Sequence, residues 1–495
     1  MSDLELDDAT LAASTEPPRT RLGQQLGRLA KQSAIYGLGS MVSRLLAVLL
    51  LPLYTHYLTP SDYGKVAILT AWSAVLVIVL RAGISTAFFR FYFDAEDDAG
   101  RIRVVRTSFW FTMTMATAGL VVGLVLAGPI SAAFNDVGAG LVRAAFVGIW
   151  AQMNYEQLTS LFRVEQRALG FGLASLANVL VTVVAMVVFV AVLHWHALGL
   201  IVGNFTGTLA IYLGLLAYRR YQLGLEFDRH LLREMNRFGM PLVPSALALW
   251  AINFVDRFLV LWLKGKDAVG VYTIGVQVSS AIVFLLFAFR TAWPAYAYSI
   301  KEDDEAKLTY GFVLTYLAFI TCWISTALGV LAPWIVRLLT SKPSYYGAER
   351  TVAPLCFAAA AFAAYTVVAI GVGRARKTQF NWVITGLAAA LNIGLVLALV
   401  PPLGIFGAAL ASLVAYVAMF LGMVWNAQRV YPVRYQWRRI GTLAAAAAAL
   451  TVVGRLTRGP FALELGLALA LPLVLFPLGF YLPGERARLG ALLHR

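Results

Sequence analysis

Apolar stretches of about 20 residues recur along almost the whole chain, and this repetition constrains the fold more than any other feature. Fourteen can be counted, centred near residues 45, 77, 118, 151, 182, 208, 250, 281, 320, 362, 390, 415, 448 and 471. An apolar helix of ~20 residues crosses the ~30 Å hydrocarbon core of a bilayer and satisfies its own backbone hydrogen bonds there. At 60% hydrophobic residues and a mean hydropathy of +0.75, the chain is too apolar for a soluble enzyme. The pattern predicts an all-α, multi-pass membrane protein with about 14 transmembrane helices.

The distribution of positive charge fits this topology. With a cytoplasmic N-terminus and alternating loops, the inner segments hold 27 of the 40 Lys and Arg residues, the outer loops hold 8, and the apolar stretches hold the other five. This is the asymmetry of the positive-inside rule. It predicts that both termini are cytoplasmic, and it accounts for the net charge of +15 without a nucleic-acid partner.

The chain divides into two halves and a C-terminal pair of helices. The acidic, proline-containing residues 1–24 are predicted to form a disordered cytoplasmic tail. Helices 1–6 fall in residues 25–217 and helices 7–12 in 238–427. The basic segment 218–237 between them is predicted to be a cytoplasmic linker with an amphipathic surface helix. Residues 428–495 hold helices 13 and 14 and a cytoplasmic C-terminus.

The two halves resemble each other. Arg44 and Arg81 lie 37 residues apart on helices 1 and 2, and Arg257 and Arg290 lie 33 apart on helices 7 and 8. Because each half has an even number of helices, both enter the membrane from the same side. The pattern therefore predicts parallel repeats related by an axis along the membrane normal.

Five arginines lie within apolar stretches, where each costs roughly 2.5–3.5 kcal/mol on insertion scales unless it faces a wet cavity or a partner. They are Arg44, Arg81, Arg143, Arg257 and Arg290. Arg143 is close to the outer surface, where snorkelling explains it. The other four predict a path for an anionic substrate. Because a guanidinium makes bidentate bonds to phosphate, a diphosphate head group fits them better than a cation. The alternative is an interfacial role for Arg81 and Arg290, which lie toward the cytoplasm, and a buried pair with an acidic residue for Arg44.

Polar neighbours on the same helix faces complete the candidate site, which has no catalytic residue or metal. The candidate substrate-binding residues are Arg44, Ser40, Arg81, Gln152, Asn253, Arg257 and Arg290. Glu156 and Asp256 are candidates for a coupling proton or sodium ion, and no other cofactor is expected. Each also has an alternative role as the ion-pair partner of an arginine, across the cavity for Glu156 and with adjacent Arg257 for Asp256.

Several classes of function find no support. The sequence contains no GxxxxGK[ST] phosphate-binding loop. It has no large extramembrane loop that would carry the carboxylates of a membrane glycosyltransferase or polymerase. A drug or metabolite exporter on the same scaffold and a non-transporting membrane scaffold remain as alternatives to a transporter of anionic cargo.

Three segments carry a family resemblance. YGLGSMVSRLLAVLLLPLYTHYLTPSDYGKVAIL resembles the opening of bacterial polysaccharide-transport proteins, the Wzx-type flippases of lipid-linked oligosaccharides. SLFRVEQRALGFGLASLANVLVTVV is similar to the connection of helices 4 and 5 in that family. GRARKTQFNWVITGLAAALNIGLVLALVPPLGIFGAALASLVAYV is similar to the counterpart at helices 10–12. The resemblance covers most of residues 30–425.

The resemblance implies a MATE-like member of the multidrug, oligosaccharidyl-lipid and polysaccharide exporter superfamily. Such proteins fold as two pseudo-symmetric six-helix lobes in a V around a central cavity, with two further C-terminal helices. The implied activity is translocation of a polyprenyl-diphosphate-linked oligosaccharide from the cytoplasmic to the outer leaflet of a bacterial inner membrane, for cell-surface polysaccharide or exopolysaccharide. The implied partners are that substrate, membrane lipid, a polysaccharide polymerase and export machinery. No catalytic residue is transferred.

Overall fold

The computed structural model describes Leu46 and residues 48–485, except 221, 222, 376, 378, 379, 458 and 484. The predicted tail 1–24, Ser40 and Arg44 lie outside the described residues, so the expectations for them remain predictions.

Every regular element in the described part of the chain is a helix. The first lobe contains α3 (Leu51–Tyr57), α4 (Pro60–Arg81), α5 (Ile84–Asp94), α6 (Asp98–Val125), α7 (Ala127–Ala133), α8 (Ala139–Val164), α9 (Ala168–Val187), η1 (Val188–Val192) and α10 (His196–Arg219). The second follows α11 (Arg229–Gly239) and η2 (Met240–Leu242), and contains α12 (Val243–Ser279), α13 (Ala281–Ser299), α14 (Asp303–Val330), α15 (Ala332–Leu339), η3 (Pro343–Ala348), α16 (Glu349–Arg374), α17 (Asn381–Leu403) and α18 (Ile405–Val430). The C-terminal pair is α19 (Trp437–Thr457) and α20 (Phe461–Val474).

The multi-pass, all-α fold is confirmed. Within the described ranges, nine helices are long and apolar enough to cross a membrane, and α20 is a shorter apolar helix. Each predicted stretch from the second to the fourteenth coincides with a helix of the structure. The stretches centred near 250 and 281 fall on α12 and α13. Between them, α12 is interrupted at Gly265, whose φ of 83° places it in the left-handed region that glycine adopts without steric cost.

The second transmembrane helix of each half is broken. In the first half, α4 ends at Ala82 and Gly83, which have φ values of 47° and 78°, and α5 continues the path. In the second half, the interruption falls at Ser280, between α12 and α13. The two breaks do not occupy corresponding positions in the predicted repeat, because the first directly follows Arg81 whereas Ser280 lies ten residues before Arg290.

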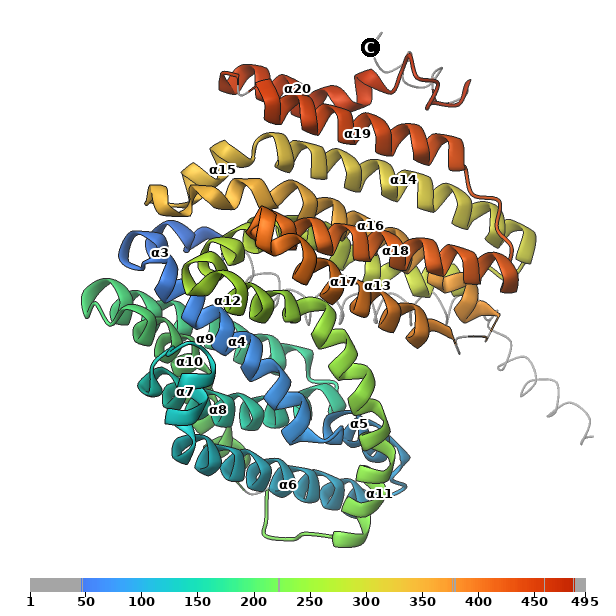
Figure 1. The fold of residues 1–495 in the computed structure, drawn as a ribbon. Helices are drawn as coiled ribbons and strands as arrows, with labels where there is room; N and C mark the ends of the chain where they lie inside the picture. The colour runs from blue at the N-terminus through green and yellow to red at the C-terminus, as the bar shows by residue number, and fades with distance from the viewer. Residues whose placement is uncertain are drawn as a thin grey trace, which may run out of the picture.

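The two lobes meet along α4 and α12, which pack against each other at the centre of the molecule (Figure 1). In the first lobe, α5, α6, α8 and α10 share a core that includes Phe88, Phe109 and Tyr212. In the second, α13, α14, α16 and α18 share a core that includes Trp293 and Tyr310. The pair α19 and α20 packs on α14, at the edge of the second lobe away from the first (Figure 1).

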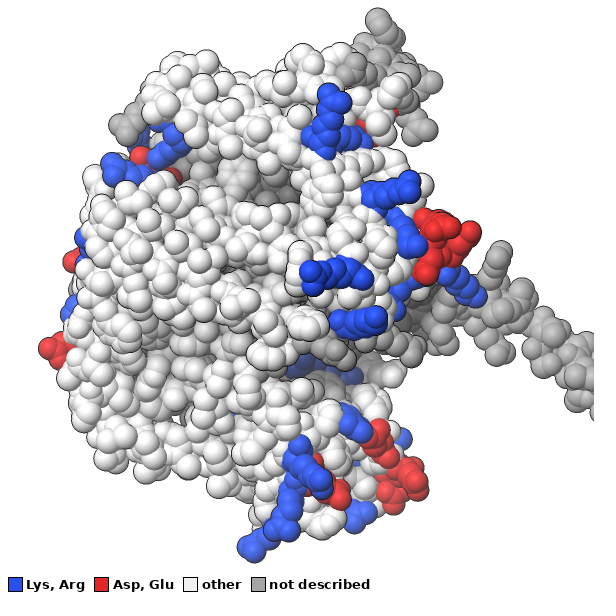
Figure 2. All heavy atoms as spheres, turned by 45° about the vertical axis from the view of Figure 1, so that its right-hand side comes forward, with Lys and Arg blue, Asp and Glu red and all other residues white. Residues whose placement is uncertain are grey.

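The surface has the character of a membrane protein. Figure 2 shows a broad uncharged region across the middle of the molecule, with the charged side chains gathered toward its sides. Large apolar side chains are exposed on the helices, for example Leu173 at 68%, Leu387 at 66% and Leu473 at 76%. Such exposure is stable when lipid covers the helices, because lipid tails are as apolar as these side chains.

Candidate functional site

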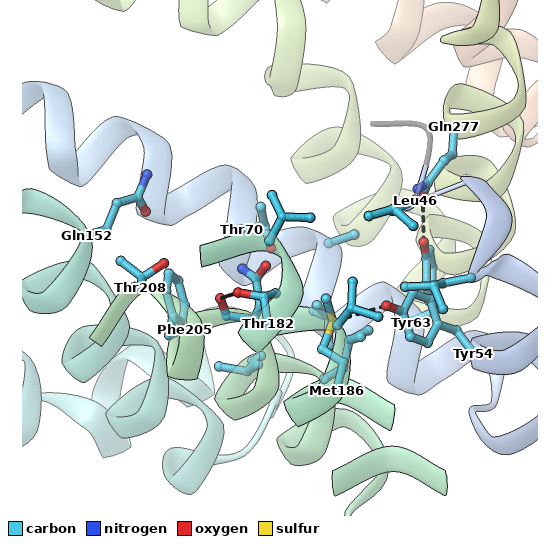
Figure 3. A pocket seen from close by; sticks show the side chains of 18 of the residues that line it. Leu46, Tyr54, Tyr63, Thr70, Gln152, Thr182, Met186, Phe205, Thr208 and Gln277 are labelled. Atoms are coloured by element: carbon cyan, nitrogen blue, oxygen red, sulfur yellow. Dashed lines mark hydrogen bonds between the residues drawn. The ribbon is translucent and has the colours of Figure 1, made fainter. Parts of the chain in front are cut away.

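A cavity of about 560 Å³ lies where α4, α8, α9 and α10 of the first lobe face α12 of the second. Its wall combines apolar side chains with a large set of polar ones (Figure 3). The side chains that carry amide, hydroxyl or charged groups are Tyr54, Tyr63, Thr70, Gln152, Tyr155, Glu156, Asn178, Thr182, Asn204, Thr208, Arg257, Thr273 and Gln277. Leu46 and Leu50, from the predicted first helix, also line it.

Two helices supply a connected group of neutral polar side chains. Asn178 and Thr182 lie one turn apart on α9, so they share a face. Thr182 donates a hydrogen bond to Asn178 Oδ1 at 3.1 Å, and Asn178 Nδ2 lies 3.4 Å from Thr208 Oγ1 on α10. This group was not predicted from the sequence. The pattern that would have indicated it is the spacing of four residues between Asn178 and Thr182, repeated by Asn204 and Thr208.

Arg81 and Glu156 form an ion pair beside the cavity. Arg81 Nη1 lies 2.6 Å from Glu156 Oε2, and Arg81 Nη2 donates to the Met153 carbonyl oxygen at 3.2 Å. Gln152 Nε2 donates to Glu156 Oε1 at 2.9 Å. Glu156 and Gln152 line the cavity. Arg81 does not line it and lies behind Glu156, its ion-pair partner. Of the two roles considered for Glu156, the structure places it as the partner of an arginine, and a coupling role stays a prediction.

Arg257 places a second guanidinium at the cavity wall. It is 9% exposed and lines the cavity from α12. Its Nη1 donates to the Asn253 carbonyl oxygen at 2.6 Å and lies 3.7 Å from Asp256 Oδ1, a longer separation than the Arg81–Glu156 contact. Asp256 is itself 6% exposed and accepts hydrogen bonds from the Tyr272 hydroxyl at 2.5 Å and the Arg257 amide at 2.8 Å.

The predicted residues do not all meet at this cavity. Arg290 is exposed on α13 with its guanidinium 4.9 Å from the centroid of the Phe362 ring, and it does not line the cavity. Asn253 is exposed and contributes its carbonyl oxygen to Arg257, while its side chain is not part of the wall. The physical reason is that α13 follows the interruption at Ser280, so spacing along an unbroken helix does not predict the direction of Arg290.

Hydrogen bonds join the two lobes at the end of the molecule that the predicted topology assigns to the outer side. The Tyr63 hydroxyl donates to Gln277 Oε1 at 2.6 Å across the cavity (Figure 3). Lys266 Nζ donates to the Asn135 carbonyl oxygen at 2.7 Å, and Lys342 Nζ donates to the Leu58 carbonyl oxygen at 3.1 Å. These bonds join the first lobe to the second, so the structure represents a state closed at this end.

The charges of the wall favour an anion. Among the described lining residues, Glu156 is the one carboxylate, and it is already neutralised by Arg81. Arg257 faces a carboxylate only at the longer distance of 3.7 Å. The remaining amides and hydroxyls can donate to and accept from the hydroxyl groups of a neutral polar ligand. The arrangement suits binding of a molecule with an anionic part and a polyhydroxylated part.

Solved structures define the class of fold. The lipid II flippase MurJ in an inward closed conformation matches with a TM-score of 0.73 and 13% identity, over 89% of this chain and 98% of that one. An inward-facing multidrug resistance MATE family transporter of the MOP superfamily matches with a TM-score of 0.61 and 16% identity, over 79% and 98%. The protein has the fold of the MOP superfamily.

Sequence comparison then gives the family. Residues 55–343, more than half of the chain, match the family model described as polysaccharide biosynthesis protein, and the chain belongs to that family. An uncharacterized membrane protein of Methanocaldococcus jannaschii is 23% identical over 209 residues, 40% of each chain. The probable multidrug resistance protein YoeA of Bacillus subtilis is 26% identical over 221 residues, 41% of this chain and 46% of that protein. The matches span less than half the length of these curated relatives.

Proposed function

We propose that the protein is a flippase that moves a polyprenyl-diphosphate-linked oligosaccharide from the cytoplasmic to the outer leaflet of a bacterial inner membrane, for cell-surface polysaccharide or exopolysaccharide biosynthesis. The observation that carries the proposal is the composition of the cavity wall, which combines the Arg257 guanidinium with neutral amides and hydroxyls. Membership in the polysaccharide biosynthesis family and the name of the MurJ neighbour, a lipid II flippase, support it.

Each part of such a cargo has a matching environment. The diphosphate binds Arg257 and Arg81, because guanidinium–phosphate bonds are charge-assisted and bidentate. The sugar hydroxyls exchange hydrogen bonds with Asn178, Thr182 and the neighbouring amides. The prenyl chain stays in lipid, where it loses no hydrophobic stabilisation. Arg44 and Arg290 remain candidates for contact with the diphosphate at other stages of transport.

Glu156 provides a way to couple binding to a proton. Its carboxylate pairs with Arg81, the guanidinium that a diphosphate would also bind. An arriving diphosphate competes for Arg81 and releases Glu156 from its ion pair. The freed carboxylate is the group that we propose to bind the coupling proton. Glu156 is a better candidate than Asp256, since Asp256 already accepts two hydrogen bonds inside the second lobe.

Translocation follows an alternating-access cycle. The outer contacts, such as Tyr63–Gln277 and Lys266–Asn135, hold the cavity closed on that side while cargo enters from the cytoplasmic leaflet. Their rupture lets the two lobes separate at the outer end and opens the cavity outward. Downstream, a polymerase and export machinery would consume the product, and this consumption is a second source of net transport.

A drug or metabolite exporter is the second candidate, favoured by the names of YoeA and the MATE structures. A carboxylate that is free to pair favours organic cations, and the one carboxylate among the described lining residues is already paired with Arg81. A non-transporting scaffold is the third candidate. The Arg81→Gln/Arg257→Gln double variant, expressed at native level in a deletion strain of the host, separates all three.

We expect the double variant to lose polymer export while its efflux of cationic dyes stays unchanged. Arg143→Gln is the matched control, because Arg143 is also within an apolar stretch but is exposed and does not line the cavity. Normal export together with unchanged dye efflux in the double variant, at normal protein level, would support a scaffold. Loss of dye efflux with intact export would support the drug exporter.

A further inference from the structure

A second cavity lies on the membrane-facing surface of the second lobe, in a groove between α17 and α18. It measures about 580 Å³ and shares no lining residue with the central cavity. Its walls are apolar side chains of both helices, including Ile384, Leu387 and Leu391 from α17 and Ala418 and Gly422 from α18. Leu387 is 66% exposed. The groove is therefore open to the hydrocarbon of the bilayer.

The length of the groove matches one leaflet. Its lining on α17 runs from Phe380, just before the first residue of the helix, to Leu391. At 1.5 Å per residue this stretch rises about 16 Å, or about half of the ~30 Å hydrocarbon core. The groove thus begins at the membrane surface and ends near the bilayer midplane.

Hydrogen-bond donors and positive charge gather at the surface end of the groove alone. Lys377 and Arg429 line it there, and both are exposed. Arg429 stacks on Trp425, with its guanidinium carbon 3.7 Å from the ring centroid, which holds it at the groove. In the predicted topology, this end of the groove lies on the cytoplasmic side of the membrane, where the positive charges gather.

Asn426 supplies an independent indication of a ligand. It lines the same end of the groove, is 3% exposed, and its Nδ2 has no hydrogen-bond partner among the described residues. A buried amide donor without a partner is destabilising, so native proteins rarely leave one unless a ligand or water completes it. An acceptor oxygen placed between Lys377 and Arg429 would satisfy it.

We infer that this groove binds one anionic phospholipid of the cytoplasmic leaflet. The phosphodiester accepts hydrogen bonds from Lys377, Arg429 and Asn426 Nδ2, and an acyl chain fills the apolar groove as far as Leu391. Basic pockets between transmembrane helices on the cytoplasmic side are suited to anionic head groups. The groove's length favours a phospholipid acyl chain over a longer polyprenyl chain. The inference does not depend on the identity of the transported cargo.

Native mass spectrometry of the full-length protein, titrated with phosphatidylglycerol or phosphatidylcholine, tests the inference. The wild type should retain phosphatidylglycerol preferentially, and Lys377→Ala/Arg429→Ala should weaken that retention about ten-fold or more. Arg434→Ala/Arg438→Ala is the matched control, since it removes two exposed charges from the same end without touching the groove. Ala418→Phe fills the apolar part and leaves the charges, and it should also displace the lipid.

Three results would overturn the inference. Equal losses in the groove variant and the control would indicate general electrostatic attraction. Unchanged retention in Ala418→Phe, with glycerol phosphate competing as well as intact lipid, would indicate a head-group site only. Retention of undecaprenyl phosphate as strong as that of phosphatidylglycerol would assign the groove to the polyprenyl chain. Size-exclusion profiles and circular dichroism identify variants that fail to fold, and for these Lys377→Gln/Arg429→Gln replaces the alanine pair.

Discussion

Gly64 of α4 and Gly270 of α12 lie at the crossing of the two lobes, each against the backbone of the other helix. A Cβ atom at Gly64 would lie 2.0 Å from the Lys266 carbonyl oxygen, and one at Gly270 would lie 1.9 Å from the Pro60 carbonyl oxygen. The contact is reciprocal, as expected for corresponding helices of a repeated structure. No side chain fits between the two backbones in this state.

Replacing Gly64 by leucine should therefore disfavour the closed outer end. Overpacking costs about 1–3 kcal/mol, which corresponds to a shift of about 5- to 150-fold in the balance of two states. The shift is measured as faster labelling of a Thr70→Cys reporter by an impermeant maleimide from the outer side, in a Cys322→Ser/Cys356→Ser background. Gly214→Leu is the control, because a Cβ there has no neighbour within 4 Å. Equal labelling rates in both variants would show that the glycine contact does not control opening.

The Tyr63–Gln277 hydrogen bond should contribute to the same equilibrium. Tyr63→Phe removes the 2.6 Å bond between the lobes while keeping the ring that packs near Tyr345. Loss of this bond should destabilise the closed state by about 1 kcal/mol. The Thr70→Cys reporter should then be labelled from the outer side about five-fold faster. A double-mutant cycle with Gln277→Leu isolates the pair. Strictly additive effects of the two substitutions would show that the bond is absent from the closed state in the membrane.

Glu156→Gln should strengthen diphosphate binding. The carboxylate competes with the ligand for Arg81, and a neutral amide in its place would leave that guanidinium without a charged partner. Removal of a charge-assisted contact of about 1.5 kcal/mol predicts an affinity gain of about ten-fold for farnesyl diphosphate, measured by titration calorimetry. Glu226→Gln is the control, because Glu226 pairs with Arg106 and does not line the cavity. Weaker binding by Glu156→Gln would contradict the competition.

The same variant should lose the pH dependence of transport. If Glu156 takes up the coupling proton, a glutamine at this position is permanently neutral and cannot respond to a proton gradient. Transport in proteoliposomes should then proceed at a rate that does not change when an imposed pH gradient is removed. A gradient response equal to that of the wild type would exclude Glu156 as the coupling group and leave Asp256 as the candidate.

The fold was largely predictable from the sequence because the bilayer imposes a single strong requirement on each segment. A helix such as α10 or α16 must be apolar for about 20 residues, and this is visible without knowledge of its neighbours. The turn at Gly265 was predictable as well, because it lies between the apolar stretches centred near residues 250 and 281. The contact of Gly64 with α12 was not, since it depends on which helix lies opposite, and hydropathy carries no information about that.

The candidate site was predictable only in part. Gln152 and Glu156 share one helix face by spacing, and the structure places both on the cavity wall. The partner of Glu156 depends on the relative placement of α4 and α8, which spacing within α8 cannot specify. Arg290 was included as the counterpart of Arg81 in the repeat, but it does not line the cavity. Asn178 and Thr208 were overlooked because a few neutral polar residues are common in transmembrane helices.

The central claim is that a guanidinium on the cavity wall binds the diphosphate of the cargo, and the affinity of the purified protein for farnesyl diphosphate tests it most directly. A hydrogen bond to a charged group contributes about 1.5–3 kcal/mol to binding, so losing it in Arg257→Gln should weaken binding about 10- to 100-fold. Arg143→Gln should bind within about two-fold of the wild type, since surface charges of this kind contribute little. Wild-type affinity in the folded Arg257→Gln variant, or an equal loss in both variants, would contradict the claim.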